Sequence, residues 1–114
     1  EIKSDYAKVA AALAAALRRF ATGVYLVWSP IIPRPEAHGL PRRLRTLAQQ
    51  ADRPWLHATL AIGSAPGATG LAASGMFVIN PPHTLASTLR SALPRLEDAL
   101  ARGPHAGWSV DAGG

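Results

Sequence analysis

The stretch that decides the fold lies in the second half of the chain and reads Ala73-Ser74-Gly75-Met76-Phe77-Val78-Ile79-Asn80-Pro81-Pro82-His83. Its middle, residues 76–79, is a continuous run of apolar side chains that includes β-branched and aromatic residues. A run of this kind, with glycine before it and proline after it, is typical of a short strand that is buried on both faces. We therefore expect a buried strand at residues 75–80.

The tripeptide Asn80-Pro81-Pro82 has two interpretations. It resembles the Asn/Asp-Pro-Pro-aromatic motif of amino-methyltransferases, in which carbonyl groups hold an exocyclic amine while an aromatic ring stacks on the base. The fourth position here is His83, which stacks poorly by comparison. The simpler interpretation is a turn that ends the strand, because proline cannot donate a hydrogen bond to a neighbouring strand.

Length and composition indicate one small globular domain. The chain has 114 residues, of which 48% are apolar and 17% charged, and a domain of this size can bury a real core. No apolar run approaches the roughly 20 residues that a membrane span needs. The absence of cysteine excludes disulfides and cysteine-based zinc sites, and mildly favours a reducing compartment.

The chain carries a net charge of +5, with ten arginines and only two lysines. Arginine-rich positive surfaces suit contacts to phosphate groups. The base composition of the genome would produce the same bias, so charge alone does not decide between the two explanations.

Apolar residues at spacings of three and four predict three helices. The first spans residues 4–20 with Ser4 as its N-cap, and its apolar stripe extends to Phe20. The second spans residues 41–51, with Pro41 at the first helical position. The third spans 84–102 with Thr84 as N-cap, and Pro94 should kink or break it because proline removes a helical hydrogen bond.

The apolar run at residues 24–32 predicts a strand that is covered on both faces, as in a parallel sheet, and residues 55–62 predict a second strand. A short edge strand at 108–110 is a weaker expectation. Ligands of open α/β sheets lie beyond the carboxyl ends of parallel strands, so Ser29 and Pro30 are candidates for a pocket wall. The alternative is a plain strand end. The glycine-rich residues 63–70 contain no lysine and precede no helix, so they are interpreted as a connection and not as a phosphate-binding loop.

Positive charge gathers locally in one predicted helix, at Arg42, Arg43 and Arg45, with Arg53 close behind in the sequence. These arginines either contact phosphate groups or form a solvated helix face. No group of residues in the sequence forms a recognisable catalytic site. The carboxylates do not follow the predicted parallel strands, the four histidines lack metal-ligand spacing, and His57 is interpreted as a structural residue within its strand.

Several segments, in this order, resemble the C-terminal part of the RlmJ family: Tyr6, Arg19-Phe20-Ala21-Thr22-Gly23-Val24-Tyr25, Trp28-x-Pro30, Leu60-Ala61-Ile62, residues 73–82 as quoted above, and Leu93-Pro94-x-Leu96. The resemblance covers nearly the whole chain, and is weaker at residues 33–43 and 63–72. Members of this family transfer a methyl group from S-adenosylmethionine to N6 of an adenine in 23S ribosomal RNA.

The resemblance implies an α/β fold, the C-terminal half of a Rossmann-like class I methyltransferase sheet. Residues 24–31, 55–62 and 75–80 would be its fifth, sixth and seventh strands, the seventh antiparallel and inserted between the other two, so Asn80 would lie far from the methyl-transfer site. The chain, residues 1–114, would be the C-terminal portion of one methyltransferase domain. The catalytic Asp-Pro-Pro-Tyr would precede Glu1, and the N-terminal half that binds S-adenosylmethionine would be absent.

The resemblance therefore implies no catalytic, cofactor-binding or metal-binding residue in this chain, which alone should be inactive. Ser29 and Pro30 would line the substrate pocket, and Arg42, Arg43 and Arg45 would contact RNA phosphates. The expected partner is 23S ribosomal RNA in the cytoplasm, with no membrane. The isolated chain should self-associate along the strand at 24–31 or pair with its missing half. The alternative function is a non-catalytic basic RNA-binding module.

Overall fold

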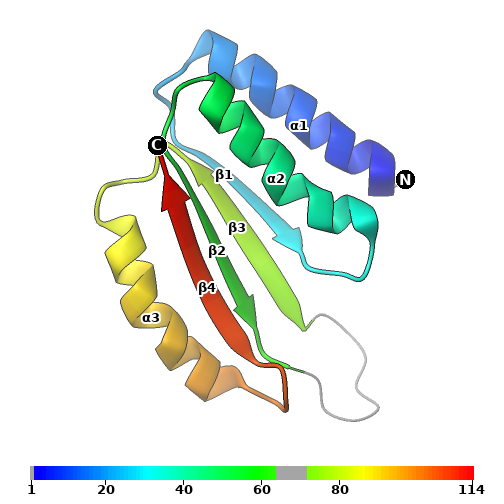
Figure 1. Ribbon diagram of the computed structural model, residues 1–114, viewed down its shortest axis with the longest axis vertical. Coiled ribbons are helices and arrows are strands. Elements are labelled where there is room, and N and C mark those ends of the chain that lie inside the picture. The colour runs from blue at the N-terminus through cyan, green and yellow to red at the C-terminus, as the bar shows by residue number, and fades with distance from the viewer. Residues whose placement is uncertain (1, 64–71) are drawn as a thin grey trace.

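The computed structural model describes residues 2–63 and 72–114, which form three helices and four strands (Figure 1). In chain order these are α1 (Ile2–Arg19), β1 (Tyr25–Pro30), α2 (Pro35–Gln50), β2 (Trp55–Ala61), β3 (Ala73–Ile79), α3 (Leu85–Leu100) and β4 (Gly107–Gly113). All three main predicted strands are found, each within two residues of its expected bounds. The predicted connection at 63–70 lies, apart from residue 63, outside the described residues.

The four strands form one sheet in the order β1-β3-β2-β4, and every neighbouring pair is antiparallel. β3 is the strand predicted from residues 75–80. It lies between β1 and β2, and Ile79 is opposite both Tyr25 and Trp55. β1 and β2 consequently run in the same direction without bonding to each other. An antiparallel strand between two parallel ones is the arrangement that the resemblance implies for this stretch.

The two edges of the sheet differ from the sequence expectation in different ways. β4 pairs with β2 along seven residues, so the short strand expected at 108–110 is longer than its apolar residues indicate. The apolar run of β1 was expected to be covered on both faces, with its second neighbouring strand in the missing half, and in the described residues β1 pairs only with β3. Its side chains Leu26 and Trp28 are 62% and 55% exposed. β1 is therefore the bare edge of this sheet.

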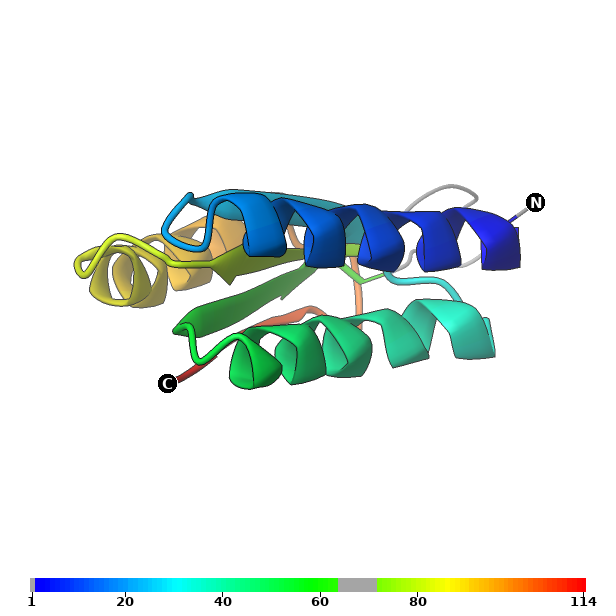
Figure 2. The same cartoon turned by 90° about the horizontal axis from the view of Figure 1, so that it is seen from above.

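Helices cover both faces of the sheet, but unequally. α1 and α2 lie side by side on one face (Figure 2), and α3 lies alone on the other, along β4 (Figure 1). The core under α1 and α2 contains Leu13, Leu17, Leu40, Leu44, Ala48, Trp55, Phe77 and Ile79. The smaller core under α3 contains Leu56, Ala58, Val78 and Leu93. The face of β1 that α3 does not reach keeps its apolar side chains in solvent.

The helix ends correct three sequence predictions. α1 begins at Ile2, so Ser4 lies inside its first turn and is not the N-cap, and Phe20 follows the helix and is exposed. α2 begins at Pro35, which leaves Pro41 inside the helix. α2 continues through Pro41 because burial of its neighbours Ala37 and Leu40 against the sheet offsets the lost hydrogen bond.

The third helix was expected to be interrupted at Pro94, and it continues through that residue from Leu85 to Leu100. Leu93, next to the proline, is buried against the sheet, and this packing compensates for the missing backbone donor. Thr84 is the N-cap by position, but its hydroxyl makes no capping bond. Neither this helix nor the others described here has the length and apolar character to cross a membrane.

Candidate functional site

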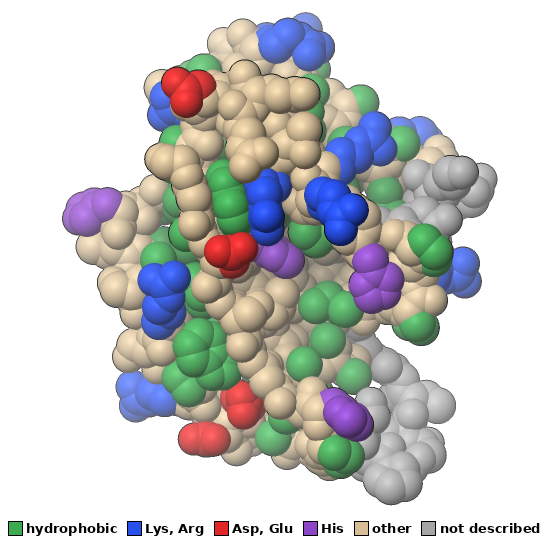
Figure 3. Space-filling model, in the orientation of Figure 1, with side chains coloured by type: hydrophobic (Ala, Val, Ile, Leu, Met, Phe, Trp, Pro, Cys, Tyr) green, Lys and Arg blue, Asp and Glu red, His purple; other side chains and the backbone are tan. Residues whose placement is uncertain are grey.

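A hollow of about 390 Å³ opens between α2 and the sheet, where β1 reaches its carboxyl end. It is lined by Ser29, Ile31, Ala37, His38, Pro41, Arg42, Arg45, His57 and Gly75. On this face, basic and histidine side chains gather near the middle, with an acidic side chain among them (Figure 3). This volume is within the range of about 300–1,000 Å³ that is usual for ligand pockets.

The floor of the hollow is made by β1, β3 and β2, whose pairing brings Ser29, Gly75 and His57 together. Ser29 on β1 is opposite Gly75 on β3, and His57 on β2 lies diagonally across from the glycine. A Cβ at residue 75 would lie 3.2 Å from Nε2 of His57, which is tighter than ordinary contact. Glycine at this position therefore leaves room for the imidazole ring.

The imidazole of His57 is half-buried and packs against the ring of Phe77, with 5.8 Å between the two ring centroids. Burial lowers the pKa of His57 below its ordinary value, and the positive charge of Arg45 lowers it further. The carboxylate of Asp111 on β4 acts in the opposite direction. These effects together favour the neutral form of the ring in the free protein.

The roof of the hollow is the side of α2 that carries Arg42 and Arg45, which are three residues apart and so share a face. Arg45 lies over the ring of Trp55, with 4.5 Å from its Cζ to the centroid, and its guanidinium donates to Asp111 at 3.3 Å. Both partners of this ion pair are largely exposed, which makes it weak. Within the described part of the chain, Arg42 has no ion pair.

The structure separates the residues that the sequence grouped. Ser29, Arg42 and Arg45 come together around the hollow, whereas Pro30 and Arg43 do not line it. Arg53 lies at the opposite end of the sheet, where its Nε donates to Oδ1 of Asn80 at 2.7 Å. It is therefore not part of the phosphate-facing cluster suggested by its place in the sequence.

Sequence reasoning missed His38, His57 and Gly75 as parts of this site. His38, Arg42 and Arg45 recur at spacings of four and three, which is a helical face, but the helix was expected to begin only at Pro41. His57 was interpreted as structural because it has no partner in the sequence. Its neighbours in the hollow come from other elements, so only the sheet register reveals them.

Asn80, the residue of the motif-like tripeptide, lies at the other end of β3 and is buried. Its Nδ2 donates to the carbonyls of Ala21 and Gly23, at 2.8 and 2.7 Å, while its Oδ1 accepts from Arg53. Its backbone has a φ of 58°, a left-handed conformation that asparagine tolerates better than most residues. Asn80 thus joins the ends of three elements, in agreement with the turn interpretation.

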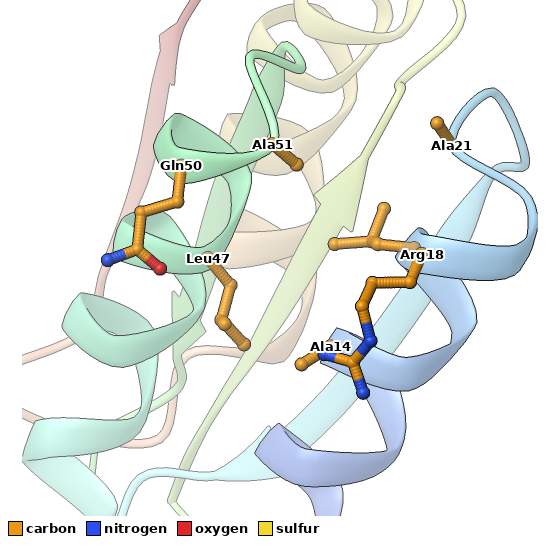
Figure 4. A pocket seen from close by; sticks show the side chains of 7 residues that line it. Ala14, Arg18, Ala21, Leu47, Gln50 and Ala51 are labelled. Atoms are coloured by element: carbon orange, nitrogen blue, oxygen red, sulfur yellow. The ribbon is translucent and has the colours of Figure 1, made fainter.

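A second hollow, of about 320 Å³, lies between α1 and α2 (Figure 4). Alanine and leucine dominate its lining, and its longer polar side chains are Arg18 from α1 and Gln50 from α2. Two such groups do not form a catalytic arrangement. Across residues 2–63 and 72–114, no group of three histidine, aspartate or glutamate side chains is close enough to hold a metal ion.

Comparison with known proteins assigns the family. Two curated relatives, both named ribosomal RNA large subunit methyltransferase J, are 35% identical over 97% of this chain (Haemophilus influenzae) and 36% identical over 88% of it (Escherichia coli). The chain spans 38% and 35% of the lengths of these two relatives.

A crystal structure of a Legionella pneumophila protein superimposes on 97% of this chain, and on 39% of its own chain, with a TM-score of 0.81. Its sequence identity is 22%, so this likeness supports the fold alone. The family model described as ribosomal RNA large subunit methyltransferase D, RlmJ, matches residues 1–112. Together with the two relatives, this match shows that the chain belongs to the RlmJ family of ribosomal RNA large subunit methyltransferases.

Proposed function

We propose that this chain is part of an S-adenosylmethionine-dependent enzyme that methylates N6 of an adenine in 23S ribosomal RNA in the cytoplasm. The observation that carries the proposal is the family match over residues 1–112. The basic hollow at the carboxyl end of β1 supports it, because ligands of α/β sheets bind at that end of parallel strands.

The chain is the C-terminal portion of one methyltransferase domain, and β1, β2 and β3 are its fifth, sixth and seventh strands. The order β1-β3-β2 with an antiparallel β3 supports this assignment. The bare edge of β1 and the exposed side chains of Leu26 and Trp28 are the surface on which the rest of the domain packs. A pocket of about 360 Å³ beside them has an almost entirely apolar lining, which suits such packing.

The described residues do not fit S-adenosylmethionine. β1 and β3 lead into α2 and α3 through residues 31–34 and 80–84, and neither connection contains glycine. A backbone that wraps a cofactor closely normally needs glycine at such a turn. Cofactor binding and the catalytic Asp-Pro-Pro-Tyr therefore belong to the remainder of the protein, and this chain alone is inactive.

The contribution of this chain is to place the RNA. The target adenine must leave its stack to reach the remainder of the enzyme, and the strand on either side of it must be held. Ser29 forms part of the pocket wall, and Pro30 follows it at the strand end without lining the hollow. Arg42 and Arg45 contact backbone phosphates from the hollow, and Arg43 contacts them from outside it. Holding the base in line with the methyl donor would supply much of the rate enhancement.

The test compares the intact gene product with the 114-residue chain, using unmodified 23S ribosomal RNA and mass spectrometry of its nucleosides. We expect N6-methyladenosine only with the intact protein, and no saturable binding of S-adenosylmethionine to the short chain by calorimetry. An intact protein that binds RNA but neither binds the cofactor nor forms the methylated product would instead support the alternative function, a non-catalytic RNA-binding module. That alternative rests on the net charge of +5 and the basic hollow, which suit RNA binding with or without catalysis.

The domain assignment has its own test in the short chain. A strand edge with unpaired backbone groups beside apolar side chains tends to pair with another chain. We expect light scattering to show dimers or larger species, and slow amide exchange along residues 24–31. Replacing both Leu26 and Trp28 by serine should weaken the association, whereas serine at exposed Leu100 on α3 is the matched control. A stable monomer with fast exchange along 24–31 would contradict the assignment.

A further inference from the structure

The hollow under α2 collects hydrogen-bonding groups that the fold itself leaves unused. Ser29 comes from β1, His57 from β2 and Arg42 from α2. In the part of the chain that the structure describes, none of these three side chains makes a hydrogen bond to another residue. Asn80 and Arg53, at the opposite end of the same strands, are by contrast bonded to protein. No buried side-chain nitrogen or oxygen of the described residues lacks a partner, so these three groups are open to solvent and free to bind a ligand with several acceptors.

The charge of the hollow specifies the kind of ligand. Two guanidinium groups, of Arg42 and Arg45, line the hollow, and one carboxylate, that of Asp111, pairs with Arg45. The excess is positive, so the hollow attracts an anion. Guanidinium groups present planar pairs of donors that match two oxygens of a phosphate, and charge-assisted bonds of this type are stronger than neutral ones.

We infer that this hollow binds one phosphodiester group of the RNA strand, with Arg42 and Arg45 contacting it from the helix and His57 from the floor. The inference rests on the proposed function, and it names the part of the RNA that this surface takes. Ser29 adds a hydroxyl donor from β1, and Gly75 opposite it leaves room for the imidazole ring of His57 at the floor. Arg43, which does not line the hollow, has no part in this site.

Phosphate binding is coupled to a proton on His57. Arg45 from α2 and Asp111 from β4 act on the charge of its ring, and Phe77 and Gly75 from β3 lie beside it. The polar and charged groups that share the hollow with it are Arg42 and His38 from α2 and Ser29 from β1. Burial and Arg45 hold the pKa of His57 below its ordinary value in the free protein. An anion at hydrogen-bond distance favours the charged ring and raises this pKa, so the complex holds a proton that the free protein lacks.

The sign of the pH dependence follows from this difference. Above the pKa of the complex, neither state is protonated and affinity is constant; below the pKa of the free protein, both are protonated and affinity is constant again. Between the two values, affinity rises as pH falls, by up to about tenfold for each unit by which binding raises the pKa.

The experiment measures binding of a short single-stranded RNA to the intact gene product between about pH 5.5 and pH 8, around the ordinary histidine pKa. We expect affinity to increase by about tenfold toward acid in the wild type, and to change less than about twofold in His57→Gln. His83→Gln removes an exposed histidine at the opposite end of the sheet and should keep the wild-type profile. A His57→Gln protein with an unchanged pH profile would overturn the inference.

A second measurement covers the case in which His57→Gln does not fold. In the wild type, the His57 ring is titrated by NMR with no ligand, with inorganic phosphate, with adenosine monophosphate and with RNA. A pKa raised by RNA supports the site, and competition by phosphate or by the mononucleotide shows that a phosphate group is what it recognises. A pKa raised by phosphate but not by RNA would contradict the inference.

The same materials separate this inference from the proposed function. An intact protein that does not methylate adenine, but whose His57 pKa is raised by RNA, would refute the proposed enzyme and leave the phosphate site. Normal methylation by a protein whose RNA binding does not involve His57 would refute the phosphate site and leave the proposed enzyme. Asp111→Asn adds a further check, since removing the carboxylate that pairs with Arg45 should tighten RNA binding at pH 8 by several-fold.

Discussion

The two ends of the central strands use polar side chains in opposite ways. Where β3 finishes, the side chain of Asn80 is buried and bonded to Arg53 and to the carbonyls of Ala21 and Gly23. Where β1 finishes, Ser29 and the residues around it face an open hollow. One end of the sheet joins chain segments together, and the other end is available to a ligand.

The difference teaches how little a short motif decides without its surroundings. Asn80-Pro81-Pro82 is the most motif-like tripeptide in the sequence, yet the polar groups of Asn80 point into the protein. The stretch Trp28-Ser29-Pro30 carries no such signal, yet it reaches the edge where the basic hollow opens. The direction of β3, antiparallel to its neighbours, places the two at opposite ends.

The largest effect expected is on stability, from Asn80→Ala in the intact protein. The substitution removes three side-chain hydrogen bonds, one of them to a charged arginine, and puts alanine at a φ of 58°. We expect a loss of about 3 kcal/mol in the free energy of unfolding, measured with a chemical denaturant. Turnover of the folded protein should stay within about tenfold of wild type.

Asn80→Gly is the matched control, because glycine accepts the left-handed backbone while also removing the side-chain bonds. It should be less destabilising than alanine by about 1 kcal/mol. A loss of several orders of magnitude in turnover with folding intact would show that this end of the sheet takes part in the reaction.

The next effect concerns RNA affinity, from Arg42→Glu with Arg45→Glu in the intact protein. Reversing both charges should weaken RNA binding at least tenfold, and each phosphate group that the protein no longer neutralises should lower the slope of log affinity against log salt by about 0.7 to 0.9. Stability should change little, because both side chains are exposed. Arg43 is on the same helix but outside the hollow, so Arg43→Glu should lower the slope less than the double substitution does. Equal slopes in all variants would leave these arginines as solvated surface.

The smallest effect expected is that of Gly75→Ala, which probes the floor of the hollow. The new Cβ would lie 3.2 Å from Nε2 of His57, so the ring must move by a few tenths of an ångström. We expect a stability change below about 1 kcal/mol and a several-fold weaker affinity for RNA. Gly39→Ala on α2, where an added Cβ meets nothing, is the control and should leave RNA affinity unchanged. A Gly75→Ala protein with full RNA affinity would show that the ligand does not reach the floor.

The strands were predictable because apolar runs bounded by glycine and proline leave few alternatives. Residues 55–62 and 75–80 are found as β2 and β3 almost unchanged. β4 was only partly predictable, because glycine and polar residues interrupt its apolar positions. Its backbone pairing with β2 stabilises it as a strand although its composition does not favour one. The start of α2 at Pro35 was not predictable from local signals, because a second proline at residue 41 is an equally good first position.

The candidate site was predictable only as fragments. Arginine spacing along one helix identified Arg42 and Arg45, and the end of an apolar strand identified Ser29. The contribution of His57 depends on Gly75, which comes from another strand, and on the diagonal across the sheet that relates them. No local pattern records such a relation, so a lone histidine in a strand was interpreted as structural.

The position of β3 also governs the order in which the protein can assemble. β1 and β2 leave the ribosome before β3, yet each of them bonds to β3 and not to the other. Until residues 73–79 have been synthesised, the nascent chain therefore carries two apolar strands that still lack β3 as their partner. Folds that depend on contacts between distant parts of the sequence form slowly, and until they form they expose hydrophobic segments that tend to aggregate. A single late strand thus converts a growing chain into a sheet, and chaperone protection should matter most just before it emerges.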